Sequence, residues 1–132
     1  MIKSLEKVLQ DPNLNIQALK TLAENSFDSI LITDATNRPK IIYANKAFKN
    51  LTGYSPAEVL GKTPKILQGP ATDKTVISRL AKTLSTGSRF EGKAINYKKD
   101  GAPFLMHWRV VPVKLGKDTK VWLAIQRETF SI

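Results

Sequence analysis

Apolar side chains recur every three or four residues over positions 2–9 and again over positions 14–23, which is the period of an amphipathic helix. Asp11 and Pro12 separate the two stretches, and this pair favours a new start because aspartate caps a helix and proline fits its first turn. The pattern therefore predicts a short helix, a break and a second helix that ends near Asn25.

The rest of the chain alternates between strand-like and helix-like segments. Two compact β-rich runs are predicted to form a hairpin, and three longer β-like segments close the chain, at about 29–33, 40–44, 89–98, 104–114 and 120–127. Asp100-Gly101 and Gly116-Lys117-Asp118 separate the last three segments and are typical of hairpin turns. Between the two groups, capping residues and glycines delimit helices at about 45–53, 55–61, 63–69 and 73–86. The order predicts an α+β fold, a five-stranded antiparallel sheet with short helices on one face and an N-terminal helical cap.

Side chains alternate across a strand, so the last three segments assign residues to two faces of the sheet. One face collects mostly large apolar residues and two amides: Phe90, Gly92, Ala94, Asn96, Phe104, Met106, Trp108, Val110, Trp122, Ala124 and Gln126. The other face collects Ile95, Tyr97, Leu105, Val111, Val121, Leu123 and Ile125, and His107 shares its parity. Both faces are thus expected to be largely apolar. The short helices can cover one, and the N-terminal helices or a second chain must cover the other.

Composition narrows the function classes. A length of 132 residues fits one domain, and the absence of cysteine excludes disulfides, thiol nucleophiles and any light-driven thiol adduct. The net charge is +10, and positions 38–132 hold 18 basic and 6 acidic residues; the basic residues form no tract, so nucleic-acid binding is ranked last. No apolar run has the ~20 residues of a membrane span, and no signal peptide is seen, so we expect a cytoplasmic protein. No catalytic constellation is found, and we expect a protein that is not an enzyme.

Several segments resemble one family. The run 45–55, Asn-Lys-Ala-Phe-Lys-Asn-Leu-Thr-Gly-Tyr-Ser, resembles the signature turn of PAS sensory domains. Residues 61–70 lie where the light-oxygen-voltage (LOV) subfamily carries its flavin-binding helix, and residues 95–101 and 122–126 are similar to its sheet motifs. The resemblance spans about 27–127. We therefore expect an N-terminal cap and dimerisation segment over 1–26, a LOV-like PAS domain over 27–128 and a tail over 129–132.

The resemblance implies a flavin, FMN or FAD, between the short helices and the sheet. It places Gln68, Asn96 and Gln126 among polar residues that face the flavin, and Lys65 and Lys74 where the family often has arginines on the phosphate. The same comparison shows departures. Pro64 stands in place of the photoactive cysteine, Thr63 and Met106 replace asparagines, and Trp108 stands where a smaller aromatic residue is usual.

Each of these residues also has a structural interpretation. An amide at Gln126 facing flavin N5 must reorient when the flavin is reduced, but it is equally a core glutamine bonded to Asn96 or to a helix backbone. Gln68 can cap the preceding short helix, and Trp108, Met106 and Trp122 can fill the cavity and leave no room for a ligand.

Two functions follow from these alternatives. The first is a flavin-binding redox or light sensor without cysteinyl-adduct photochemistry, which signals through the sheet surface and a homodimer interface. The second is a cofactor-free PAS module for dimerisation or protein interaction. In either case the partners expected are a second copy, bound through the N-terminal helices and outer sheet face, and a downstream signalling protein.

Overall fold

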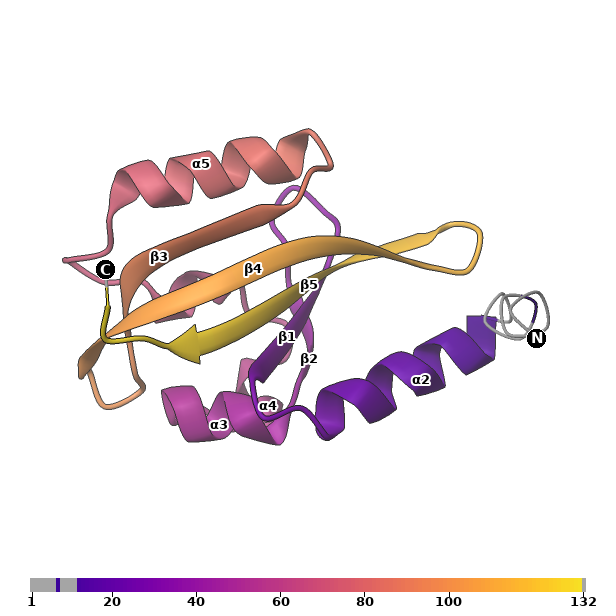
Figure 1. Ribbon diagram of the computed structural model, residues 1–132, viewed down its shortest axis with the longest axis horizontal. Coiled ribbons are helices and arrows are strands. Elements are labelled where there is room, and N and C mark those ends of the chain that lie inside the picture. The colour runs from indigo at the N-terminus through magenta and orange to yellow at the C-terminus, as the bar shows by residue number, and fades with distance from the viewer. Residues whose placement is uncertain (1–6, 8–11, 132) are drawn as a thin grey trace.

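The computed structural model describes residue 7 and residues 12–131; the helix predicted over 2–9 lies outside the described residues except for Lys7. The five strands form one antiparallel sheet in the order β2-β1-β5-β4-β3, as predicted (Figure 1). They are β1 (Ser29–Asp34), β2 (Ile41–Ala44), β3 (Phe90–Tyr97), β4 (Pro103–Leu115) and β5 (Thr119–Glu128). Strand β1, from the first hairpin, therefore lies in the centre beside the last strand.

The helices also follow the predicted order. They are α2 (Pro12–Glu24), α3 (Lys46–Thr52), α4 (Pro56–Val59), the 3₁₀ helix η1 (Pro64–Leu67) and α5 (Lys74–Ser85). Asn45 and Ser55 cap α3 and α4 with their side chains, as the sequence predicts. Asp73 caps α5 by accepting from the backbone N–H of Thr75 at 2.9 Å, and this bond, after the one from the Thr75 hydroxyl, lowers the pKa of the Asp73 carboxyl.

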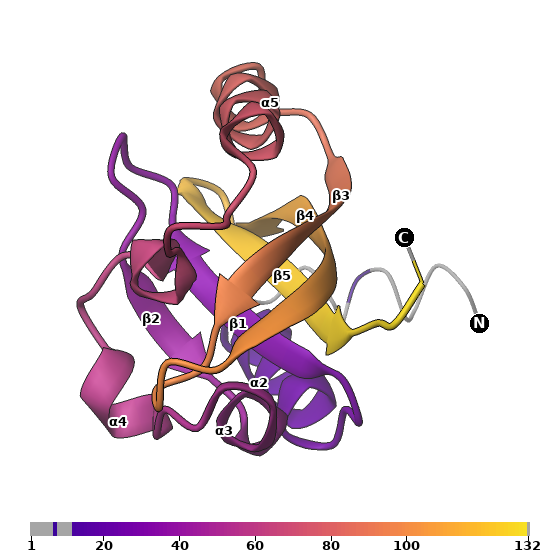
Figure 2. The ribbon, with the colours of Figure 1, turned by 90° about the vertical axis from the view of Figure 1, so that its left-hand side faces the viewer.

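Two hydrophobic clusters lie on opposite faces of the sheet. The larger one is on the inner face, between the strands and helices α3, α4, η1 and α5, and it contains every apolar residue that alternation assigned to that face. The smaller one packs α2 against the outer face, through Leu19 and Ala23 over Ile30, Ile32 and Val121. Figure 1 shows α2 running beneath the hairpin of β4 and β5, and Figure 2 shows α5 standing on the far side of the sheet from it.

The buried amide of Asn45 joins three elements. Its Oδ1 accepts from the backbone N–H groups of Ile30 and Phe48, at 2.9 and 3.0 Å, while its Nδ2 donates to the carbonyls of Ala23 and Asp28, at 2.7 and 3.0 Å. All the hydrogen-bonding capacity of this side chain is thus used, and it links the end of α2, the start of β1 and the first turn of α3.

The outer face differs from the prediction in one respect. We expected it to be largely apolar, but beyond the part that α2 covers it carries Glu91, Lys93, His107, Arg109 and Arg127 in register on β3, β4 and β5. The alternation grouped the apolar residues of this face correctly and left out the charged residues that share their parity. Among the described residues, no helix has the length and apolar character needed to cross a membrane.

Candidate ligand site on the inner face of the sheet

Three side chains fill the space between α5 and the sheet. The guanidinium of Arg79 on α5 lies 4.6 Å from the ring centre of Phe90 on β3, and the Phe90 ring lies 5.2 Å from the indole of Trp108 on β4. We call these three residues the aromatic stack. Phe90 is 2% and Trp108 5% exposed, so the stack is sealed from water at its base; cation–π and tilted aromatic contacts of this kind are favourable.

Glycine at position 92 makes the stack possible. Gly92 is directly opposite Trp108 in the register of β3 and β4. A Cβ atom at this position would lie 2.6 Å from the Phe90 ring and 2.8 Å from the Arg79 guanidinium, both too short for a real contact. The Phe90 ring therefore folds over a position with no side chain.

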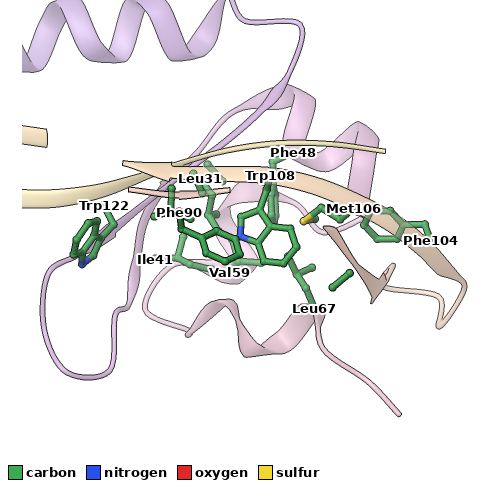
Figure 3. Packing of buried hydrophobic residues seen from close by; sticks show 14 residues of the cluster. Leu31, Ile41, Phe48, Val59, Leu67, Phe90, Phe104, Met106, Trp108 and Trp122 are labelled. Carbon is green, nitrogen blue, oxygen red and sulfur yellow. The ribbon is translucent and has the colours of Figure 1, made fainter. Parts of the chain in front are cut away.

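Met106 fills the neighbouring part of the inner face. It is 1% exposed and belongs to the same cluster as Leu67 and Phe104, and Figure 3 shows its sulfur between Trp108 and Phe104. In the same view Trp122 lies apart from Trp108, toward the other end of the cluster (Figure 3). Trp108 and Met106 together thus occupy the centre of the predicted ligand site, and Trp122 does not.

The amide of Asn96 bonds inside the protein. With its nitrogen facing acceptors, it donates to the backbone carbonyls of Ile95 and Leu67, both at 3.2 Å. In the opposite orientation the nitrogen faces the Met106 sulfur at 3.3 Å; the choice between the two is an assignment from the surrounding acceptors. The first orientation links β3 to η1, a structural role.

Gln126 is paired with a residue that the sequence did not single out. Its Oε1 accepts from the hydroxyl of Ser29 on β1 at 3.0 Å, and both residues are buried. The expected partners, Asn96 or a helix backbone, are not the ones found. Over residues 12–131, no buried side-chain nitrogen or oxygen lacks a hydrogen-bond partner.

The remaining predicted site residues lie nearer the surface. Thr63 and Gln68 flank η1 and are half-buried, and the lysines at 65 and 74 are exposed. Neither flanking side chain caps η1; the backbone N–H of Gln68 bonds to the Lys65 carbonyl instead. The structure brings together Asn96, Met106, Trp108 and Gln126 on the inner face and leaves the two lysines in solvent.

The turn after η1 is fastened to β3. The Thr72 hydroxyl donates to the Ile95 carbonyl at 2.7 Å, and the backbone N–H of Ala71 donates to the Tyr97 hydroxyl at 2.8 Å. A Cβ at Gly69 would lie 2.2 Å from the Tyr97 ring, so only glycine lets the turn approach so closely. These contacts give the segment 69–72, within the LOV-like run, a packing role independent of any ligand.

A charged cluster on the outer face was missed by sequence reasoning. A His107 ring nitrogen lies 2.7 Å from Glu91 Oε2, and Arg109 lies 3.5 Å from Glu91 Oε1. The hydrogen bond with His107, and then the charge of Arg109, lower the pKa of the Glu91 carboxyl. Asp28 pairs with Arg127 at 2.7 Å, and a hollow of about 270 Å³ lies between the two groups. Its signal was the shared parity of 91, 107, 109 and 127.

With this geometry established, the chain can be placed in a family. It matches the PAS domain family over residues 28–129, and it belongs to that family. Within it, the LOV-like character is supported by a curated relative, phototropin-2 of Oryza sativa subsp. japonica, which is 40% identical over 100 residues. That match covers 74% of this chain and 11% of phototropin-2, so the chain spans about a tenth of the relative's length.

Solved structures agree. A LOV domain studied with a flavin analogue superimposes with a TM-score of 0.74 at 30% identity, over 87% of this chain and 84% of that one. An RNA-binding LOV receptor superimposes with a TM-score of 0.78 at 27% identity, over 89% of this chain and 34% of that one. The resemblance to LOV domains and the expected PAS architecture are thereby confirmed, and flavin is the ligand that this comparison associates with the family.

The residues of this chain do not fit a flavin as they are packed. A flavin between η1, α5 and the sheet needs space at the centre of the inner face, and the Trp108 indole and the Met106 side chain occupy it. It also needs free amide edges, but Gln126 is bonded to Ser29 and Asn96 has partners inside the protein. The expectation of FMN or FAD agrees with the relatives, while this packing agrees with the alternative of no ligand.

Proposed function

We propose that this chain is a PAS sensory module that signals through contacts with protein, without a bound cofactor and without catalysis of its own. The observation that carries the proposal is the burial of Trp108 against Phe90, at 5.2 Å, in the place where the family binds its ligand. A solid inner face stabilises the fold and leaves the outer face and α2 as the surfaces that can exchange partners.

The partner that we propose is a second copy, bound through α2 and the uncovered part of the outer face. Helix α2 packs Leu19 and Ala23 on the sheet while it exposes Ile16 by 49% and Leu22 by 72%. Phe27, which follows α2, is fully exposed. Large apolar side chains turned to solvent support a docking surface, and a two-fold dimer uses the same surface on both chains.

The first test is an absorbance scan of the purified full chain from the near ultraviolet to the blue, before and after incubation with FMN or FAD. We expect no visible band in either case. A yellow protein would overturn the proposal.

The second test is sedimentation of the full chain at micromolar concentration. We expect a dimer, and we expect Leu22→Asp to give a monomer because a carboxylate would be placed in the interface. Leu60→Asp is the matched control, since Leu60 is 53% exposed beside α4, on the helical side of the inner face. A monomeric wild type, or equal dissociation in both variants, would contradict the proposed interface.

The second candidate function is a flavin-binding redox or light sensor. It is favoured by the LOV relatives and by Gln68, whose side-chain amide makes no hydrogen bond to the described residues. Because Pro64 has no sulfur and the chain has no cysteine, such a sensor would work without a cysteinyl adduct. The absorbance scan separates the two candidates.

A further inference from the structure

The inner face contains two buried amides, Asn96 and Gln126, each next to one large apolar side chain. Trp108 is directly opposite Gln126 in the register of β4 and β5, and the Met106 sulfur lies 3.3 Å from the Asn96 amide. We propose that Trp108 and Met106 close a latent ligand site, and that reducing these two side chains opens it to the flat ring of a flavin. This inference rests on the proposed function in one respect, that the wild-type chain takes no flavin.

The register shows what lies around the indole. On one side of Trp108 is Gly92, which has no side chain, and on the other is Gln126. The Phe90 ring covers the indole from the direction of α5. Removing part of the indole therefore opens a single space bounded by bare backbone, an aromatic ring and an amide.

Met106 controls the second amide. Its side chain is 1% exposed and lies beside Leu67 and Phe104. An asparagine at this position would replace a thioether, which is a weak acceptor, by a group that both donates and accepts. The enlarged space would then have apolar walls and three amides at its edge.

These walls define the class of occupant. Apolar cavities in proteins take flat aromatic molecules, and amides that both donate and accept recognise a ring edge carrying alternating N–H and C=O groups. The flat ring system of a flavin has this character. The exclusion of flavin in the wild type thus depends on the volume of two side chains rather than on the loss of polar groups.

The experiment titrates FMN into four full-length proteins, the wild type, Trp108→Phe, Met106→Asn/Trp108→Phe and Trp122→Phe. Quenching of flavin fluorescence gives Kd, and structured visible absorbance reports a ring held in a fixed environment. We expect the double variant to bind FMN with a Kd at least about tenfold lower than the wild type. Trp108→Phe should shift in the same direction by less. Trp122→Phe is the matched control, because it makes the same change in a tryptophan buried to 6% exposure at the other end of the cluster, and it should bind like the wild type.

Each outcome decides a separate question. Tight FMN binding by the wild type overturns both the inference and the proposed function. A folded double variant that binds no better than the wild type overturns the inference alone. An equal gain in Trp122→Phe also overturns it, because any loosening of the core would then suffice. Circular dichroism identifies folded proteins, and if the double variant is unfolded, the single variant Trp108→Phe decides by the same comparison.

Discussion

The two faces of the sheet solve different problems with side chains from the same strands. Along β4, Trp108 is buried in the aromatic stack, and the next residue, Arg109, is largely exposed beside Glu91. On the inner face polar atoms have partners inside the protein, and apolar groups fill the space. On the outer face charges pair across strands in contact with water. The inner face therefore holds the fold together, and the outer face can change its contacts at small cost to stability.

The largest expected effect is at Trp108. Trp108→Ala should lower the free energy of unfolding by about 3–5 kcal/mol, because it removes a buried indole and leaves a cavity. The adjacent outer-face change, Arg109→Ala, should stay within about 1 kcal/mol, as for exposed ion pairs. Urea unfolding of both variants measures the difference, and similar losses at 108 and 109 would contradict the contrast between the faces.

A smaller effect is expected at Gly92. Gly92→Ala should cost about 2–3 kcal/mol, since the added methyl overlaps the Phe90 ring and the core must shift to accommodate it. The outer-face neighbour Lys93→Ala should change stability by at most about 0.5 kcal/mol. Thermal unfolding followed by circular dichroism gives both values. A neutral Gly92→Ala would show that Phe90 does not lie over this position.

The hydrogen bond between Ser29 and Gln126 gives a third prediction. Ser29→Ala should cost about 1–2 kcal/mol, because it leaves the buried Gln126 Oε1 without its donor. In the Ser29→Ala background, Gln126→Leu should then cost less than it does in the wild type, since both polar partners are gone. Urea midpoints for the four proteins of this cycle test it, and strictly additive losses would mean that the pair does not interact.

The smallest effect is expected at Glu91 on the outer face. The hydrogen bond with His107 lowers the pKa of the Glu91 carboxyl in the folded protein. The stability that this provides is present above the ordinary glutamate pKa and is lost as the pH falls through the lowered value. Glu91→Gln should therefore be slightly less stable than the wild type at neutral pH, with a difference that shrinks in acid. Urea midpoints across this range measure it, with Asp118→Asn in the exposed β4–β5 turn as control; a difference that grows in acid would contradict the assignment.

The sequence predicted the elements and the inner face because these depend on local alternation and turn chemistry. Residues 104, 106, 108 and 110 fall on the buried side, and Asp100-Gly101 marks the turn, whatever the strand order. The partner of Gln126 could not be predicted in this way. Ser29 meets it only because β1 enters the sheet beside β5, a pairing between residues 97 positions apart.

The aromatic stack shows a similar limit. Phe90 and Trp108 were both assigned to the inner face, but their contact depends on the missing side chain at position 92 and on the rotation of α5 that brings Arg79 over the ring. The apolar pattern of α5 fixes which side it buries, and it does not fix where a long cationic side chain at its margin comes to rest. Whether the predicted ligand site is open or closed was therefore beyond the reach of the pattern.

The four hydrogen bonds of Asn45 have a consequence for how force passes through the domain. They hold the last turn of α2 to the root of β1 and to α3 through one rigid amide, so the helix cannot pivot at this joint without breaking buried bonds. A push on the exposed side of α2 is then delivered to the central strand as a movement of the whole lever. Mechanical coupling between the N-terminal helix and the sheet is in this way concentrated in a single side chain.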